Sequence, residues 1–252
     1  MISDPKSSDI SCLRLLLFHT GNLGTVAASS EVKIVGGYEC NSCSVPWQVS
    51  LDMGYHGCGG SLFSDRWVVS AAHCYYSYLK VLLGAHSLMD RTGTERLVGV
   101  DSIYQHPQFN IYSLDHNIML IELAETLHMN DYIHPVPLPT KYPLPHTEFV
   151  MPDKLHYVSV PLMNDDVCNS ADPGLITSTM ICAGYMQCKL PFEMHLLGIP
   201  KPCGDSGGPL VCDGLLEGIV PWGQGCAQRN YPGVYTKVCT LLPWIHKIMA
   251  TK

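Results

Sequence analysis

The amino-acid sequence predicts an all-β fold that ends in one short helix, and two observations support this. Between residues 34 and 240, strand-length apolar runs alternate with breaks rich in Gly, Pro, Asn and Ser, as at residues 47–51, 67–70 and 118–121. Runs of this length that are rich in β-branched residues and bounded by turn formers are typical of strands. No long segment with a 3.6-residue period interrupts them, so we expect a sandwich or barrel.

The C-terminus departs from the strand pattern. Pro243 is followed by Trp244, Ile245, Ile248 and Met249, which fall on one face of a helix. Because proline is favoured at the first helical position, this spacing predicts a short amphipathic helix that begins after Pro243.

Length and composition describe an ordinary globular protein. The 252 residues suit one large domain or two small barrels with a shared core, and 46% apolar against 15% charged residues argues against disorder. The net charge is −7 and no Lys/Arg cluster exists, so we expect neither nucleic acid nor an anionic membrane as a partner. No stretch approaches the roughly 20 apolar residues of a membrane span.

Twelve cysteines indicate an oxidising, extracellular environment. No CxxC pair stands beside a second CxxC or an HxxxH pair, so disulfides are the better interpretation and no metal site is expected. Residues 1–33 are expected to be a signal segment plus propeptide. Residues 13–18 are apolar except for Arg14, and residues 26–28 resemble a small-residue cleavage site. The alternative is a disordered start.

Three segments carry residues suited to catalysis. His73 follows the apolar run at 67–70, and histidine is the usual general base because its ordinary pKa lies near neutral pH. Ser206 lies in the sequence GDSGGP at residues 204–209, where glycines allow a sharp turn and bring N–H groups close to a substrate carbonyl. The polar residues 114–117 enter an apolar strand, where a buried carboxylate would orient the histidine.

The serine segment also satisfies the GxSxG elbow of α/β-hydrolases. That fold needs an acid and then a histidine after the serine. Only His246, in the expected terminal helix, follows Ser206. The order of these residues therefore excludes the elbow interpretation.

Seven motifs, taken in order, resemble the trypsin-like (chymotrypsin-fold) serine proteases and are closest to vertebrate trypsin. They are IVGGYEC (34–40), GCGGSL (57–62), WVVSAAHC (67–74), NIMLIEL (117–123), CAGY (182–185), GDSGGP (204–209) and CAQRNYPGVYTKV (226–238). The resemblance makes residues 34–252 a trypsin-like protease domain of two six-stranded antiparallel Greek-key barrels. It implies a secreted serine endopeptidase that hydrolyses protein or peptide substrates through an acyl-enzyme.

In the family's pattern Ser206 is the nucleophile, His73 is the general base, and the N–H groups of Gly204 and Ser206 form the oxyanion hole. The family's orienting aspartate falls on Asn117. The same Asp→Asn change in such a triad is known to lower kcat about 10⁴-fold by stabilising the wrong histidine tautomer. Asp115 lies two residues away, roughly 6.6 Å along a strand, and would need a register shift to replace it. We therefore expect impaired activity.

The resemblance also implies activation by proteolysis. Cleavage after Lys33 would free Ile34, whose new amino group would pair with Asp205 and order the oxyanion loop. An activating protease is therefore an expected partner, and protease inhibitors are another. The propeptide at residues 29–33 lacks the acidic run that precedes the lysine in typical trypsinogens.

The substrate pocket departs from that of trypsin. Residues 199–203 contain no carboxylate where trypsin-like specificity needs one, and Lys201 would repel an Arg or Lys side chain. Trp222, Gly223 and Gly233 match family residues of the substrate site.

The cysteines and one long gap also depart from the family. Three pairs match its bridges: Cys58–Cys74, Cys168–Cys182 and Cys203–Cys226. Half-cystines without their family partner stand at Cys40, Cys212 and Cys239, and the additional cysteines are Cys12, Cys43 and Cys188. Between residues 139 and 168 the chain lacks a strand that carries a cysteine and a Gly-Trp-Gly motif. The second barrel is therefore expected to be incomplete.

Calcium is not expected as a cofactor, because only Asp90 and Glu95 offer carboxylates across residues 85–95. Two other functions stay open. One is a non-catalytic protease homologue that binds peptides or acts as a decoy. The other is a defective gene product, suggested by residues 186–202, which are unlike the family.

Overall fold

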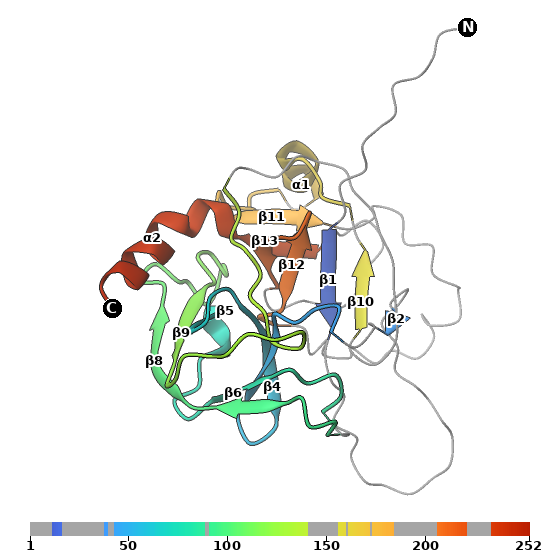
Figure 1. Ribbon diagram of the computed structural model, residues 1–252. Coiled ribbons are helices and arrows are strands. Elements are labelled where there is room, and N and C mark those ends of the chain that lie inside the picture. Colours follow the sequence, from blue (N-terminus) through green and yellow to red (C-terminus); the bar gives the residue numbers. More distant parts are fainter. Residues whose placement is uncertain are drawn as a thin grey trace, which may run out of the picture.

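The protein folds into two antiparallel β-sheets with a helix at the C-terminus (Figure 1). The computed structural model describes residues 12–16, 38–39, 43–88, 91–140, 156–159, 161–171, 173–183, 206–220 and 233–252. Within these residues no helix is long and apolar enough to cross a membrane. The predicted all-β class with a C-terminal helix is confirmed.

The first sheet has the strand order β7-β6-β3-β4-β5-β9-β8. Its strands are β3 (Gln48–Asp52), β4 (His56–Leu62), β5 (Trp67–Ser70), β6 (Lys80–Leu83), β7 (Arg96–Val98), β8 (Val100–Gln105) and β9 (Met119–Leu123). The two edge strands β7 and β8 are separated in the chain by Gly99 alone, so the edges of the sheet must lie next to each other. Ala124 N–H donates to the Gly99 carbonyl across this junction (3.0 Å). The sheet therefore curls into a barrel, and β7 and β8 act as one bent strand.

The second sheet has the order β11-β14-β13-β12-β1-β10-β2. Its strands are β1 (Cys12–Leu16), β2 (Tyr38–Glu39), β10 (His156–Ser159), β11 (Met180–Ala183), β12 (Pro209–Cys212), β13 (Leu215–Ile219) and β14 (Gly233–Lys237). A short helix, α1 (Asp165–Ala171), precedes β11. The Asn164 side chain begins α1, since its Oδ1 accepts the Val167 N–H at 2.8 Å.

The strand β1 occupies a place that the sequence does not predict. The chain after residue 139 was expected to leave the second barrel one strand short. In the structure β1, from a segment expected to be a leader, lies between β12 and β10 (Figure 1). The sheet is continuous across this position.

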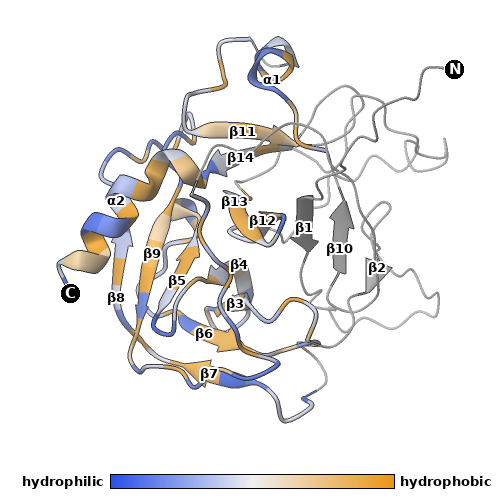
Figure 2. Ribbon diagram, turned by 45° about the horizontal axis from the view of Figure 1, so that its top comes forward, coloured by the Kyte–Doolittle hydropathy of each residue, from blue (hydrophilic) through white to orange (hydrophobic). Residues whose placement is uncertain are grey.

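One core joins the first sheet to part of the second. Buried residues of β3–β7 and β9 pack together with Val211, Leu216 and Ile219 of the second sheet and with Val238, Leu241 and Ile245 of the terminal helix. The strands β5, β9 and β11–β13 consist largely of hydrophobic residues (Figure 2). The two sheets thus hold each other through a shared apolar interior.

The terminal helix, α2 (Val238–Ala250), begins five residues earlier than Pro243 suggests. Val238 directly follows β14, and the buried residues Val238, Leu241 and Ile245 lie at i, i+3 and i+7 on one face. Burial of this face outweighs the hydrogen bond that Pro243, inside the helix, cannot donate.

Candidate active site

His73 is placed by a short 3₁₀ helix, η1 (Ala72–Cys74), which only Ala71 separates from β5. Two contacts hold this helix at the end of the first barrel. A disulfide joins Cys74 to Cys58 of β4, and the Gln105 side chain donates to the Ala72 carbonyl at 2.9 Å. The apolar strand therefore ends in a rigid turn that presents His73.

Asn117 lies beside His73 and is completely buried at the entry to β9. Its side-chain Oδ1 accepts the backbone N–H of His73 at 3.1 Å. Its Nδ2 lies 3.0 Å from the ring Nδ1 of His73, whereas Oδ1 is 3.3 Å from the same nitrogen. From β14, the Thr236 hydroxyl donates to the Asn117 carbonyl at 3.0 Å. Hydrogen bonds thus hold both the side-chain amide and the backbone carbonyl of Asn117.

This orientation of the amide decides the protonation of the His73 ring. A flipped amide would aim its NH₂ group at the backbone N–H of His73, which would place two donors against each other. With Oδ1 on the backbone, Nδ2 donates to Nδ1, so Nδ1 must be the unprotonated nitrogen. The ring proton then sits on Nε2, the nitrogen that a general base needs free.

Burial lowers the pKa of His73, and a proton on Nδ1 donated to Asn117 Oδ1 would offset only part of that effect. Burial favours the neutral ring because it removes water from the charged form. An amide carries no charge, so it cannot stabilise an imidazolium as a carboxylate does. The ring is thus a weak proton acceptor in this environment.

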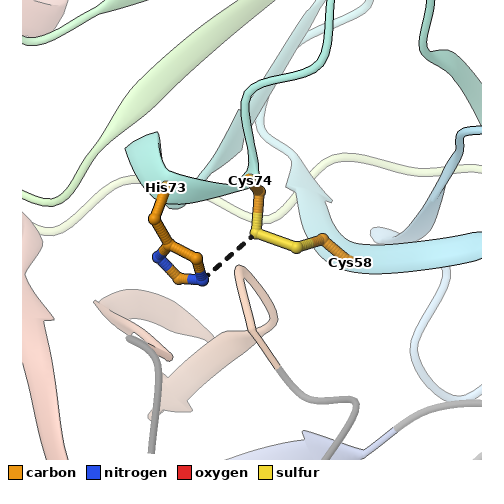
Figure 3. A group of neighbouring side chains, drawn as sticks. All are labelled: Cys58, His73 and Cys74. Atoms are coloured by element: carbon orange, nitrogen blue, oxygen red, sulfur yellow. Dashed lines mark hydrogen bonds between the residues drawn. A yellow bond between two sulfur atoms is a disulfide. The ribbon is translucent and has the colours of Figure 1, made fainter. Parts of the chain in front are cut away.

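The Nε2 atom of His73 faces a disulfide (Figure 3). It lies 3.6 Å from Sγ of Cys74, which is bonded to Cys58. These three side chains cluster as metal ligands do. However, a metal binds the thiolate form of cysteine, and both sulfurs here are bonded to each other. The cluster is therefore not a metal site.

Ser206 begins the segment that leads into β12, and it is packed against the first barrel. Its carbonyl accepts the N–H of Gly59 on β4 at 2.7 Å. The next residue, Gly207, has φ +82° and no room for a side chain, since an added Cβ would lie 2.1 Å from Ser70 Oγ and 2.4 Å from the Gly59 carbonyl oxygen. The glycine at this position is what lets the serine segment reach β4 and β5.

His73 and Ser206, both among the described residues, are not joined by a hydrogen bond. Nucleophile and base pairs in serine hydrolases approach to hydrogen-bond distance, although this contact is often looser without substrate. The two predicted catalytic residues therefore lie in one region of the fold without a hydrogen bond between them.

Asp115 is engaged elsewhere and does not replace the missing carboxylate. It accepts hydrogen bonds from the hydroxyls of Thr177 (2.7 Å) and Thr179, and its Oδ2 is 3.2 Å from His116 Nδ1. Burial opposes ionisation of Asp115, but these hydrogen bonds and the charge of His116 outweigh it and lower the pKa. The carboxylate therefore anchors the turn before Asn117 to the segment before β11.

Several predicted site residues lie outside the described residues: Lys33, Ile34, Lys201, Cys203, Gly204, Asp205, Trp222, Gly223 and Cys226. Gly233 is described and begins β14, where an added Cβ would lie 2.8 Å from the Tyr235 hydroxyl. Besides Cys58–Cys74, a second disulfide joins Cys168 of α1 to Cys182 of β11.

The loop between β6 and β7 carries Glu95, one of the two acids of residues 85–95. The carboxylate of Glu95 accepts the N–H groups of Thr92 (2.7 Å) and Gly93 (2.9 Å), so both of its oxygens are used by its own loop. Calcium takes six to eight oxygen ligands. Asp90, the other acid, lies outside the described residues.

Sequence reasoning finds His73, Asn117 and Ser206 but misses the residues that position them. Thr236 holds the Asn117 backbone, Thr177 and Thr179 anchor the preceding turn, and Ser70 donates to the Gly59 carbonyl at 2.7 Å. Threonine and serine in or near a strand carry no pattern that would single them out.

A curled antiparallel sheet and a second antiparallel sheet, with a histidine and a serine in the region where the two meet, are the architecture of the chymotrypsin-like two-barrel class. The comparisons with known proteins agree. The family model described as Trypsin matches residues 34–245. The chain is 45% identical to Trypsin-10 of Gadus morhua over 242 residues, which cover 91% of this chain and 96% of the relative.

Two further relatives give the same result. Identity is 44% to a trypsin of Xenopus laevis, covering 90% of this chain and 96% of the relative, and 42% to Trypsin I-P1 of Gallus gallus, covering 90% and 93%. The chain belongs to the trypsin family and is, by that membership, a serine-type endopeptidase.

Proposed function

We propose that this protein is a secreted zymogen of the trypsin family whose peptide-bond hydrolysis is strongly reduced by Asn117. In the proposed reaction Ser206 Oγ attacks the substrate carbonyl, and His73 Nε2 takes the serine proton and then delivers it to the leaving amine. The N–H groups of Gly204 and Ser206 stabilise the oxyanion. An acyl-enzyme on Ser206 is then hydrolysed by water.

The observation that carries this proposal is the double contact of the Asn117 amide. Its oxygen faces the backbone N–H of His73 and its NH₂ group faces Nδ1. In the resulting tautomer Nε2 carries the proton, so it cannot accept one from Ser206. A loss of about 10⁴-fold in kcat, as known for this change in the family's triad, corresponds to about 5 kcal/mol of transition-state stabilisation.

The test is to replace Asn117 by aspartate in protein that has been cleaved after Lys33. We expect Asn117→Asp to raise kcat by about 10³–10⁴-fold and to speed fluorophosphonate labelling of Ser206, because a carboxylate accepts from Nδ1–H and frees Nε2. Asn130→Asp is the matched control. Asn130 Oδ1 also accepts backbone N–H groups, those of Tyr132 and Ile133, but Asn130 is exposed and does not contact His73.

A folded Asn117→Asp variant without labelling or turnover would contradict the proposal. That outcome would favour the second candidate function, a non-catalytic homologue that binds peptides. The absence of a hydrogen bond between the described residues His73 and Ser206 favours this candidate. Peptide binding by the Ser206→Ala variant without turnover in any variant would support it.

Activation by cleavage after Lys33 is part of the proposal. The free amino group of Ile34 would form an ion pair with Asp205 and order the oxyanion loop, as the family's pattern implies. We expect fluorophosphonate labelling of the Asn117→Asp protein to depend on this cut. Labelling at the same rate in a Lys33→Gln variant that resists cleavage would refute the zymogen step.

The proposed substrates are proteins or peptides without a cationic residue before the scissile bond. Lys201 stands in the stretch where trypsin-like specificity needs an acid, and a lysine there repels Arg and Lys side chains. We propose no metal cofactor, because the Glu95 carboxylate is occupied by its own loop. A peptide panel cleaved by Asn117→Asp without preference for Arg or Lys would support this pocket, and a strong Arg preference would overturn it.

A further inference from the structure

His106 is a buried histidine that directly follows β8, and only 7% of it is exposed. Its ring Nδ1 accepts the backbone N–H of Gln108 at 3.2 Å, so this nitrogen carries no proton. The backbone N–H of His106 donates to the carbonyl of Ile118 at 3.0 Å. Because Ile118 directly follows Asn117, this bond holds His106 close to the backbone that carries the Asn117 amide.

The ring of His116 stacks on the ring of His106. The two ring centroids are 4.6 Å apart, and the ring planes differ by 22°. His106 also contacts Trp244 of α2, with 4.8 Å between the ring centroids and an edge-to-face arrangement. His116 immediately precedes Asn117. These ring contacts therefore link the terminal helix to the turn that carries Asn117.

The backbone of His116 needs support from its surroundings. Its φ of 52° is a conformation that residues other than glycine rarely adopt, and such a conformation persists only where neighbouring groups hold it. The His116 N–H donates to Asp115 Oδ1 at 3.0 Å and to the Thr179 hydroxyl at 3.3 Å. Its side chain has two contacts, the Asp115 carboxylate 3.2 Å from Nδ1 and the stack on His106. The stack is thus one of the contacts that hold the turn.

A positive charge on both rings would force the stack apart. Charges at this separation repel more strongly in a partly buried site than in water, because the local dielectric constant is lower. Burial lowers the pKa of His106, and the charge of His116 lowers it further, whereas Asp115 opposes the shift. From α2, the neighbouring ring of Trp244 is uncharged. A protonated His106 Nδ1 would also lose its hydrogen bond from the Gln108 N–H.

We propose that His106 and His116 are a pH-sensitive positioning pair for Asn117. While His106 is neutral, the stack holds the turn and keeps the Asn117 amide against His73. Uptake of a proton by His106 opens the stack and frees the turn, so that the amide no longer fixes the His73 ring. This inference rests on the proposed function for the role of the amide, but the structural change itself needs no turnover.

The direction of the pH effect follows from the lowered pKa of His106. As the pH falls, the unfolded chain takes up a proton at this residue around pH 6.5, the ordinary value, and the folded protein does so only at lower pH. The cost to the folded state is therefore absent well above pH 6.5 and grows as the pH falls through the folded-state pKa. Histidine clusters of known pH sensors respond to mild acid in the same way. The pair thus holds Asn117 at neutral pH and loosens it in acid.

Nuclear magnetic resonance of the full-length, uncleaved protein tests the pair without reference to activity. The ring signals of His73 and His106 and the side-chain amide signal of Asn117, assigned by its loss in Asn117→Asp, are followed as the pH is lowered from neutral. We expect the Asn117 signal to change in two steps, one with the midpoint of His73 and one with the midpoint of His106. An Asn117 signal that follows His73 alone would overturn the proposal.

Three variants separate the two steps, even where their midpoints coincide. His106→Gln, which stays neutral, should leave only the step that follows His73. His116→Asn keeps a residue type that tolerates positive φ but removes the stack and its charge. The His106 ring should then titrate at higher pH, and the Asn117 signal should not follow it. His128→Gln, at an exposed position, should retain both steps.

Two results from these variants would overturn the proposal. One is an Asn117 signal that still follows His106 in His116→Asn, and the other is a second step that persists in His106→Gln. Because the titration of the unmodified chain needs no variant to fold and no turnover, its outcome is distinguishable from a failure of the proposed function. That failure would appear as absent labelling of Ser206 in Asn117→Asp at neutral pH.

Discussion

At the scale of single residues, the buried carboxyl group of Glu217 on β13 makes the folded state sensitive to pH. Only 4% of Glu217 is exposed, and its Oε2 makes no hydrogen bond with the described residues. Burial, together with the negative charge of Asp213, raises the pKa of Glu217 to about 7. A carboxyl group with a raised pKa holds its proton in the folded state over a range in which the unfolded chain releases it.

Stability from this group is therefore fully present below about pH 4.5, the ordinary pKa, and is lost as the pH rises to about 7. We expect Glu217→Gln to be more favourable for stability at pH 8 than at pH 4. The change that it causes in the free energy of unfolding should differ between the two pH values by at most about 3 kcal/mol. Chemical denaturation at both pH values measures this difference. Glu125→Gln, at an exposed position, is the control, and an equal effect of Glu217→Gln at both pH values would refute the argument.

Gly207 offers a second prediction at the residue scale. An alanine Cβ there would overlap Ser70 Oγ and the Gly59 carbonyl, whereas Gly214, with a similar φ of +75°, has open space around it. Gly214→Ala should cost about 1–2 kcal/mol from backbone conformation alone. Gly207→Ala should cost clearly more in unfolding free energy and should displace Ser206. In protein that also carries Asn117→Asp, it should therefore lower fluorophosphonate labelling of Ser206. Equal losses of melting temperature would show that the contact with β4 is unimportant.

At the scale of elements, the turn between β8 and β9 controls Asn117. Leu114 and His116 have positive φ angles of 57° and 52°, which branched or bulky side chains rarely adopt. The stacking of His116 on His106 (4.6 Å) and the hydrogen bonds to Asp115 hold the turn in this conformation. The second sheet thus positions a residue of the first barrel.

Thr179→Val tests this anchor, because it keeps the side-chain shape and removes the hydroxyl that donates to Asp115. We expect a loss of about 1.5–3 kcal/mol in unfolding free energy, the range for a hydrogen bond to a charged group. The effect should shrink at pH values below the lowered pKa of Asp115, where the carboxylate is protonated. Thr251→Val, which removes an exposed hydroxyl that donates to the Ile248 carbonyl, should change little. A pH-independent loss for Thr179→Val would argue against the anchor.

At the scale of the whole molecule, α2 closes the interior that both sheets share. Ile245 is fully buried in that core, whereas Ile248, one turn later, is partly buried. Ile245→Ala should lower the unfolding free energy by about 2–5 kcal/mol, and Ile248→Ala by less. We expect one cooperative unfolding transition, with the same midpoint by circular dichroism and by tryptophan fluorescence, because the two sheets share a core. Two separate transitions would mean that the sheets unfold independently.

Much of this molecule can be predicted from its sequence, because short motifs report local requirements. The strand runs, the sites at His73 and Ser206 and the amide at Asn117 are all visible as patterns of neighbouring residues. The orientation of the Asn117 amide cannot be predicted in this way, because it depends on the backbone N–H of His73, which lies 44 residues away in the sequence. The early start of α2 is missed as well, because burial of Val238 and Leu241 overrides the signal of Pro243.

The strand β1 escapes prediction for a similar reason. A short apolar run near the N-terminus that contains Arg14 has the same composition as a leader segment, and its partners lie far away in sequence. Its pairing with β10 and β12 is a tertiary contact that composition does not report. The sequence does reveal the vacancy, through the gap after residue 139, but not the segment that fills it.

The position of β1 also has a consequence for the order of events during synthesis. Cys12 leaves the ribosome about 200 residues before Cys212, its ladder partner. The first barrel, whose strands lie within residues 48–123, can assemble while β1 still waits for β10 and β12. Pairing across such separations is slow, because closing a long loop costs entropy before any contact forms. Completion of the second sheet is therefore expected to be the late step in folding, and the nascent chain must keep an apolar strand from aggregating until then.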